Sequence, residues 1–446
     1  MSGRAGAGCA AAPIPAPTPA PTPAPPAPTA PPRLACGVEL LGPYRDSGLE
    51  DPPYLIRRGE ALLQVSQLLL VVSAAANGRR SFDEMAAVAT GQLGRQLSSD
   101  DVRYLVEEQL GPAGILTLAN DDSDPPLPPP AEDHRVLALR FRRALLPPEV
   151  VDDAARRLGI LFRRPIVVGV LAFVVAFDAW LFGMHGVNGA LEQVVRQSGL
   201  LPFLLALTCL SAAFHEFGHA AGCRYSGARP GVIGAGVYLI WPVLYTNVTD
   251  TYRLGRAGRL RTDLGGIYFN AIFIVALAGA YAATGYEPLV AAVVVQHLLI
   301  LDQLMPWARF DGYYVVSDLT GVPDILDRVR PALRSVLPGR PPDPEIVALR
   351  PKARRLLFGY LASMVVFVLF GLVTLFTQGP GLLAAAWHSL PTHIEALENA
   401  VGMWDLPVGI LVVIQIGTLV APAVGMALTL GFLGLRLTRT ARLRWG

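Results

Sequence analysis

The sequence predicts a mainly α-helical membrane protein with about six transmembrane helices, a membrane-associated β-hairpin and a small α+β domain at the N-terminus. Composition is the first indication, because 52% of the 446 residues are hydrophobic, only 16% are charged, and the mean hydropathy is +0.43. The second is that long apolar stretches are confined to the chain after residue 160. The third is that arginines gather in alternate connecting segments. A soluble protein of this length would carry about 25% charged residues.

The transmembrane helices are predicted from windows of about 19 residues. These windows give spans at 165–184, 199–222, 264–283, 287–306, 355–377 and 407–436. The loops at 185–198, 284–286 and 378–406 contain a single arginine, Arg196, whereas the other connecting segments are rich in arginine. By the positive-inside rule, both termini and the basic segments lie on the cytoplasmic side of a bacterial cytoplasmic membrane.

Shifts in composition divide the chain into five parts. The first is a Pro- and Ala-rich tail, predicted to be disordered because such a tract builds no packed core. A soluble domain, an acidic and Pro-rich linker with an amphipathic helix, a membrane domain and a basic cytoplasmic tail follow. The predicted bounds are 1–37, 38–120, 121–160, 161–437 and 438–446.

The soluble domain shows a strand-and-helix stretch followed by two helical patterns. Ser98, Ser99 or Asp100 is expected to cap the last helix, and Gly111 with Pro112 to end it. The pattern around Asn77-Gly78, Ser81-Phe82-Asp83-Glu84 and Tyr104-Leu105-Val106 resembles the PqqD-like domain, a small winged-helix module that recognises leader peptides. This resemblance implies leader-peptide binding by residues 38–120. A generic three-helix domain without a peptide groove is the alternative that the same pattern allows.

The end of the second span carries the motif with the clearest chemistry. His215 and His219 stand at i and i+4, so both imidazoles lie on one helical face and can share one Zn²⁺, with Glu216 beside them. Catalytic zinc lowers the pKa of water, and a neighbouring carboxylate can then take the proton. Ionisable residues in an apolar helix are costly unless they are paired or bind a metal. The motif therefore predicts a zinc site for amide hydrolysis, with Glu216 as the general base.

A third ligand must come from elsewhere in the chain. Cys209 and Cys223 share the face of the two histidines poorly, which favours an acidic ligand. His297 would lie too far along its helix, and we expect it to make an interhelical hydrogen bond. The carboxylates that fit from the cytoplasmic side by topology are Asp250, Asp263, Asp302 and Asp311. The spacing alone does not choose between Asp302 and Asp311, because both lie near the inner end of the fourth span.

Residues 231–254 read as a β-hairpin rather than a span. They mix glycine, β-branched and aromatic residues, with turn signals at Pro242 and around Asp250. Beside a zinc site, an open strand edge could pair with an unwound substrate and present its backbone in extended form. A hairpin that only packs against the helices is the alternative.

Two motifs together resemble the site-2 protease family of intramembrane metalloproteases. They are His215-Glu216-Phe217-Gly218-His219 and the segment QLMPWARFDG, which begins at Gln303. In that family the second motif carries an Asn, a Pro and an Asp-Gly pair at this spacing, which implies that Asp311 is the third zinc ligand. The continuation YYVVSDL resembles the peptide zinc metalloprotease branch, which includes enzymes of daptide biosynthesis. The likeness extends over roughly residues 140–330.

Two further positions acquire roles from this resemblance, although each departs from the family pattern. Gln303 stands where the family has Asn, and Gln keeps the same donor and acceptor groups for a contact to the transition state. Asn270 matches the end of a Gly-Pro-x-x-Asn element in which Ile267 replaces the proline. The resemblance implies substrate binding by Asn270 and Gln303. For Asn270, a hydrogen bond that bridges two helices is an equally good interpretation.

The sequence therefore predicts a zinc endopeptidase that cuts near the cytoplasmic face of the bilayer. Its substrate would be a membrane-associated precursor peptide, whose leader is removed in peptide natural-product maturation, or a membrane-anchored protein. A non-catalytic transporter, or an immunity or export partner that retains the fold, is the rival, but it leaves Glu216 without a role. Nucleic acid is not expected as a partner, because the net charge is only +2 and no basic run is interleaved with aromatic residues.

Overall fold

The structure is a computed structural model of the whole chain. It describes residues 30–59, 61–118, 139–197, 200–238, 241–336 and 341–403, with a few more between 408 and 425. These residues fall into two compact units. The first comprises the described residues up to 36 and those from 71 to 118, and the second comprises residues 37–70 and those from 139 onward. Residues 38–120, predicted as one domain, thus contribute to both units.

The first unit combines a two-stranded sheet with short helices. Its strands β1 and β5 pair antiparallel, and its core contains Val72, Met85, Val102 and Leu110. Helix α1 runs across the boundary between the units. The elements are β1 (Pro32–Leu34), α1 (Gln67–Ala75), α2 (Phe82–Leu93), α3 (Ser99–Tyr104), a π-helical segment (Leu105–Leu110) and β5 (Leu116–Leu118).

Capping boxes explain where α2 and α3 begin. The Ser81 hydroxyl accepts from the backbone N–H of Glu84, and the Glu84 carboxylate accepts from the backbone N–H of Ser81 at 2.9 Å. Ser98 and Asp101 make the same exchange at the start of α3. Each box satisfies two backbone groups that would otherwise lack partners. The sequence prediction of a cap at this place is confirmed, with Ser98 as the residue that provides it.

The second unit contains two three-stranded antiparallel sheets. In both sheets the strand order follows the chain, with β3 in the middle of the first sheet and β7 in the middle of the second. The strands are β2 (Val38–Pro43), β3 (Tyr54–Arg58), β4 (Ala61–Val65), β6 (Leu139–Leu146), β7 (Ile233–Tyr238) and β8 (Trp241–Thr246).

The predicted β-hairpin is confirmed, because β7 and β8 pair antiparallel from Ile233 with Thr246 to Tyr238 with Trp241. Pro242 was expected at a turn and instead lies within β8. The third strand, β6, was missed because it comes from the segment predicted to be a linker and lies far from the hairpin in sequence.

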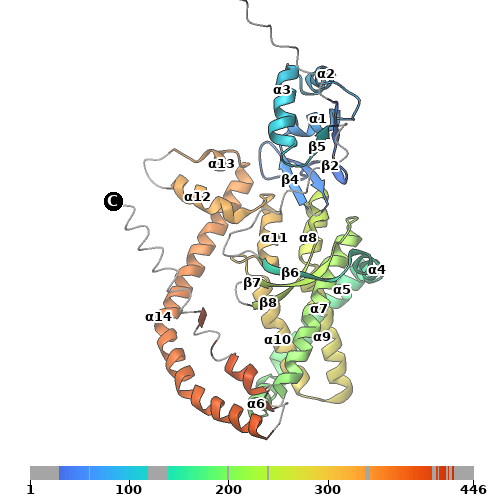
Figure 1. Ribbon diagram of the computed structural model, residues 1–446. Coiled ribbons are helices and arrows are strands. Elements are labelled where there is room, and N and C mark those ends of the chain that lie inside the picture. Colours follow the sequence, from blue (N-terminus) through green and yellow to red (C-terminus); the bar gives the residue numbers. More distant parts are fainter. Residues whose placement is uncertain are drawn as a thin grey trace, which may run out of the picture. The chain divides into compact units, whose positions relative to one another are not determined.

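Helices make up the rest of the second unit. Figure 1 shows α7 and α9 side by side, and α10 and α5 also pack against α9. The helices are α4 (Pro148–Leu158), α5 (Arg164–Trp180), α6 (Asn188–Arg196), α7 (Leu201–Tyr225), α8 (Arg256–Asp263), α9 (Gly265–Thr284), α10 (Pro288–Gln303), α11 (Asp311–Thr320), α12 (Val329–Val336), α13 (Pro344–Val347) and α14 (Pro351–Gly402).

In the part of the chain that the structure describes, four helical segments are long and apolar enough to cross a membrane, and they coincide with the first, second, third and fifth predicted spans. They are Arg164–His185, Leu201–Tyr225, Gly265–Thr284 and Pro351–Gly381. The fourth predicted span corresponds to α10, an apolar helix of 16 residues that is shorter than the roughly 20 residues a span needs. Most of the sixth, 407–436, lies outside the described residues.

The surface of α5 favours contact with lipid. No residue of α5 is buried among the described residues, and the side chains of Val168 and Val175 are 65% and 69% exposed. A continuous apolar surface of this kind is unfavourable in water. A lipid environment removes that cost, which agrees with the membrane association predicted from composition.

Two segments predicted to be loops are helical. Residues 188–196 form α6, and α14 continues from its apolar part through residues 382–402. The reason is that the hydropathy window detects where a segment ceases to be apolar, whereas a helix can continue as a polar one. The prediction that these two segments are loops was therefore wrong, because both are largely helical.

Helices α7 and α9 approach so closely that their contact admits no side chain at two glycines. A Cβ on Gly218 would lie 2.3 Å from the carbonyl oxygen of Gly265, and a Cβ on Gly265 would lie 2.4 Å from the carbonyl oxygen of Gly218. Small residues of this kind allow helix backbones to pack against one another in membranes. The pair therefore fixes the position of α9 against the part of α7 that carries the two histidines.

We expect Gly265→Ala to lower the midpoint of thermal unfolding of the detergent-solubilised chain, because overpacking costs about 1–3 kcal/mol. Gly279→Ala is the matched control in the same helix, since nothing lies within 4 Å of a Cβ at that position. It should be neutral or stabilising, because alanine is favoured over glycine in a helix by about 0.5–1 kcal/mol. Equal shifts for the two variants would contradict the close approach.

Candidate metal centre and active site

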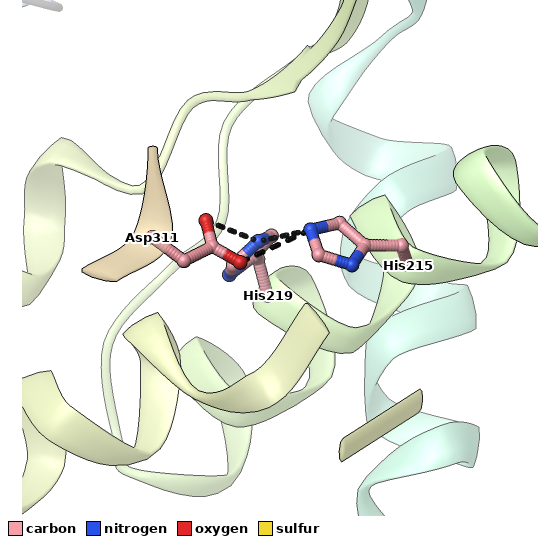
Figure 2. Close-up of side chains that lie close together, drawn as sticks. All are labelled: His215, His219 and Asp311. Atoms are coloured by element: carbon pink, nitrogen blue, oxygen red, sulfur yellow. Dashed lines mark hydrogen bonds and ion pairs between the residues drawn. The ribbon is translucent and has the colours of Figure 1, made fainter. Parts of the chain in front are cut away.

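Three side chains from two helices converge on one point. His215 and His219 project from α7, and Asp311 is the first residue of α11. The Nε2 atoms of the two histidines are 3.0 Å apart, and the Asp311 carboxylate oxygens lie 3.2 Å from one and 3.3 Å from the other. Figure 2 shows all three side chains pointing toward one another. Among the described residues, this is the only group of three or more such ligands that could hold a metal ion.

The orientation of His219 is fixed by a backbone carbonyl. Its Nδ1 lies 2.8 Å from the carbonyl oxygen of Thr262, the residue before the last of α8. A carbonyl can only accept, so Nδ1 carries the hydrogen and Nε2 presents its lone pair. Gly266 faces both rings, because a Cβ there would lie 2.4 Å from Nε2 of His215 and 2.5 Å from Nε2 of His219. A larger residue at this position would displace the imidazoles.

The geometry of the cluster fits a tetrahedral metal ion. Two nitrogens that each lie about 2.0–2.1 Å from zinc in a tetrahedral site are about 3.3 Å apart, close to the separations of 3.0–3.3 Å in the cluster. Oδ2 of Asp311 is buried, and no donor among the described residues is aligned to hydrogen-bond to it. Two imidazoles and one carboxylate leave a fourth position free, as in catalytic rather than structural sites.

The carboxyl of Asp311 is held in its ionised form. Burial raises its pKa, but the positive charges of His219 and His215, when these imidazoles are protonated, hold it below its ordinary value. A cation bound to the neutral imidazoles would act on the carboxylate in the same direction. A carboxylate must be ionised to bind a metal. Asp311 therefore has the charge as well as the position of a ligand.

Glu216 lies beside this cluster in the same cavity. The cavity has a volume of about 510 Å³, and its lining includes the two histidines, Glu216, Asp311 and Gln303. Oε2 of Glu216 accepts a hydrogen bond of 2.7 Å from the hydroxyl of Thr246, at the end of β8. The hairpin thus holds the carboxylate while its other oxygen remains available.

Strand β8 presents an open edge to this cavity. Asn247 exchanges backbone hydrogen bonds with residues 231–232, next to β7, at 2.7 and 2.9 Å. Backbone groups in an antiparallel strand alternate in direction, so those of Leu244 and Thr246 point away from β7. The backbone nitrogen of Pro242 also points away from β7. The absence of an N–H there therefore removes no hydrogen bond between β7 and β8. Among the described residues no strand pairs with this edge, and the lining of the cavity includes residues 243–249.

Of the four carboxylates considered from the sequence, Asp311 alone joins the histidines among the described residues. Asp302 is exposed on α10. Asp250 is buried and ion-paired with Arg57. His297 makes the predicted interhelical contact, because its Nε2 lies 3.0 Å from the Asp178 carboxylate on α5. Of Asp302 and Asp311, between which the spacing did not choose, only Asp311 lies beside the two histidines.

The two predicted substrate-binding residues lie in different surroundings. Gln303 lines the cavity. Asn270 is 3% exposed and lies 3.4 Å from the hydroxyl of Ser211, which is itself 2.6 Å from Oε1 of Gln296. These contacts join α7, α9 and α10, which agrees with the bridging role for Asn270. Substrate binding by either residue stays a prediction.

Sequence reasoning missed the network that supports the other wall of the cavity. The guanidinium of Arg259, 1% exposed, donates to the Asp318 carboxylate at 2.7 Å and lies 4.4 Å from the ring centroid of Tyr44. The Tyr44 hydroxyl also donates to Asp318, at 3.2 Å. The burial of Asp263 and the negative charge of Asp318 raise the pKa of the Asp263 carboxyl well above its ordinary value. No local pattern marks these residues, because Tyr44 is far from the other three in sequence.

Comparisons with known proteins add no assignment to this geometry. No family model, no curated protein and no solved structure matches the chain. The site is therefore defined by its own residues: three side chains that could hold a metal ion meet beside a hydrogen-bonded carboxylate, in a cavity bordered by an open strand edge.

Proposed function

We propose that this chain is a zinc endopeptidase that works within a membrane. The observation that carries the proposal is the meeting of His215, His219 and Asp311 in one cavity with Glu216. A metal store or transporter needs the ligands but has no use for a carboxylate placed beside them. Hydrolysis of an amide bond uses both the metal ligands and the neighbouring carboxylate.

The set of donors favours zinc as the metal. In a catalytic zinc site the protein supplies three ligands, here two imidazoles and one carboxylate, and the fourth position is left for water or substrate. When bound, zinc would supply a Lewis acid that makes water acidic enough to attack a peptide carbonyl near neutral pH. His219 is oriented for this role by the carbonyl of Thr262, and Asp311 contributes the negative charge that offsets the cation.

The residues of the chain then move the proton and position the substrate. Glu216 takes a proton from the attacking water and passes it to the nitrogen of the departing amine. Its hydrogen bond from Thr246 keeps it in one orientation through both transfers. Gln303, at the wall of the cavity, is placed to donate its amide N–H to the substrate carbonyl oxygen as negative charge develops there.

The substrate is proposed to bind as an extended strand along β8. Helical segments bury their backbone N–H and C=O groups, so a protease must first unwind them, and unpaired groups in a bilayer cost several kcal/mol each. The outward N–H and C=O groups of Leu244 and Thr246 can pair with the unwound backbone. A leader-bearing precursor peptide, recruited by residues 38–120, or a membrane-anchored protein would supply such a segment.

The site is proposed to lie near the cytoplasmic face of the cytoplasmic membrane. Both histidines lie in the second half of α7, and the chain from there to α9 contains Arg224, Arg229, Arg253, Arg256, Arg259 and Arg261. Basic connecting segments remain on the cytoplasmic side. With the six spans predicted from the sequence, both termini would lie in the cytoplasm, together with the opening of the cavity.

Metal analysis of the purified chain tests the ligand set. We expect about one zinc per chain for the wild type and little for His215→Ala or Asp311→Ala, because loss of one of three protein ligands leaves a weak site. Asp302→Ala is the matched control, since it removes an exposed carboxylate outside the cluster and should leave the zinc content unchanged. Loss of zinc from Asp302→Ala, with retention by Asp311→Ala, would disprove the assignment.

Glu216→Gln separates catalysis from metal binding. Gln cannot take the proton, so cleavage should fall by roughly 10²–10⁴-fold, while the zinc content stays at the wild-type level. Thr246 can still donate to the side-chain carbonyl of Gln, so the local structure is preserved. The readout is mass spectrometry of products from a peptide library incubated with the detergent-solubilised chain. Unchanged cleavage by the variant would exclude Glu216 as the base. If the wild type cleaves no peptide and instead transports zinc into liposomes, the chain is a transporter.

Leu244→Pro tests the strand edge. It removes an outward N–H from β8 without removing a bond to β7, so we expect cleavage roughly tenfold below that of the control Leu244→Ala. Leu244→Ala loses the side chain but keeps the N–H. Zinc content, measured in the same preparations, should be equal. Equal cleavage by the two variants would show that the edge does not bind substrate and would favour a hairpin that only packs against the helices.

A further inference from the structure

A second cavity lies on the second unit, where α4 meets the end of α7. It has a volume of about 310 Å³, and its lining includes Arg156, Arg163, Arg224 and Tyr225. Helix α4 is held against α7 by an apolar contact in which Val151 and Ala155 pack with Ala220. The cavity is therefore built by packed elements of the fold rather than by loops.

The cavity is strongly positive. Five arginines lie in or next to it, namely Arg156, Arg157, Arg163, Arg164 and Arg224. Two carboxylates offset them: Asp153 is ion-paired with Arg156 and Arg157, and Asp152 with Arg224 at 3.0 Å. Three positive charges remain in excess. Arg163 lines the cavity and makes no ion pair or side-chain hydrogen bond with any residue that the structure describes.

The cavity also lies at the level where candidate spans enter and leave the bilayer. Helix α5 begins at Arg164, α7 ends at Tyr225, and α9 begins at Gly265. Aromatic side chains mark this level, because Phe162 stacks on Tyr225 with ring centroids 5.8 Å apart, and the Tyr268 hydroxyl donates to the carbonyl of residue 161 at 2.7 Å. Aromatic residues of this kind gather at the boundary between membrane and water.

Exposed apolar side chains adjoin the arginines. Ile160 lines the same cavity and is 49% exposed, and Val168, about one turn into α5, is 65% exposed. A ligand that fits both features has an anionic head and an apolar tail. Arginine binds phosphate oxygens through several N–H donors at once.

We propose that this cavity binds the phosphate headgroup of an anionic phospholipid, with its acyl chains along α5. Basic pockets at the ends of transmembrane helices bind lipid headgroups in this manner. Arg163, without a partner among the described side chains, is the residue that the phosphate would engage first, with Arg156 and Arg224 beside it. The site is separate from the metal centre, and this inference does not depend on the proposed protease activity.

The test is native mass spectrometry of the full chain in detergent, titrated with phosphatidylglycerol or with phosphatidylcholine of the same acyl chains. The wild type should bind phosphatidylglycerol more tightly. Arg163→Gln should weaken that binding by roughly tenfold or more, because it removes charge-assisted hydrogen bonds to the phosphate. Arg164→Gln is the matched control, because it removes the same charge one residue away and outside the cavity lining. It should leave the affinity close to that of the wild type.

Three outcomes would overturn the proposal. Equal binding of the two lipids would exclude recognition of the anionic headgroup. Equal weakening by Arg163→Gln and Arg164→Gln would show attraction by general surface charge rather than binding in the cavity. Displacement of phosphatidylglycerol by excess inorganic phosphate, with no retention of lipid, would identify a free phosphate as the ligand. Because Arg163 is exposed, neither substitution should change the thermal unfolding midpoint, which is measured on the same samples.

Discussion

The close approach of α7 and α9 is the constraint on which the candidate metal centre depends. Gly218 and Gly265 let the two backbones meet, and this brings the chain just before α9 alongside α7. The carbonyl of Thr262 then reaches Nδ1 of His219, and Gly266 leaves room for both imidazoles. A buried polar ring in an apolar helix is costly without such a partner. The same contact that packs the helices therefore satisfies and orients one of the ligands.

Helix α8 connects this contact to the third ligand. Thr262, near its end, holds His219, and Arg259, one turn earlier, binds Asp318 of α11. Asp318 lies two turns after Asp311 on the same short helix, so the ion pair fixes the helix whose first residue completes the cluster. Residues 44–48 close the arrangement, since they bond to Asp318, to the start of α8 and to the end of α11. The cluster is thus held by segments from widely separated parts of the chain.

The sequence was informative where local pattern decides structure, and not where distant segments meet. The spacing of His215 and His219 placed both rings on one helical face, and the composition of residues 231–254 predicted the hairpin, because both depend on near neighbours. Strand β6, the support from Arg259 and the hydrogen bond from Thr246 to Glu216 depend on pairing across long separations. Topology alone left Asp302 and Asp311 equivalent, and only their position in space separates them. Hydropathy located the ends of apolar segments but not of helices, as α14 shows.

The two proposed sites together set the depth at which a substrate would be cut. His219 precedes Arg224 by five residues on α7, which corresponds to about 7.5 Å along the helix axis. If Arg224 marks the level of lipid phosphates, the metal centre lies only one to two turns inside it. At that depth a transmembrane segment can unwind near water, yet its freed N–H and C=O groups still lack partners in the bilayer. The open edge of β8 borders the cavity at this place, so the backbone groups that unwinding exposes would find their partners beside the proposed metal centre.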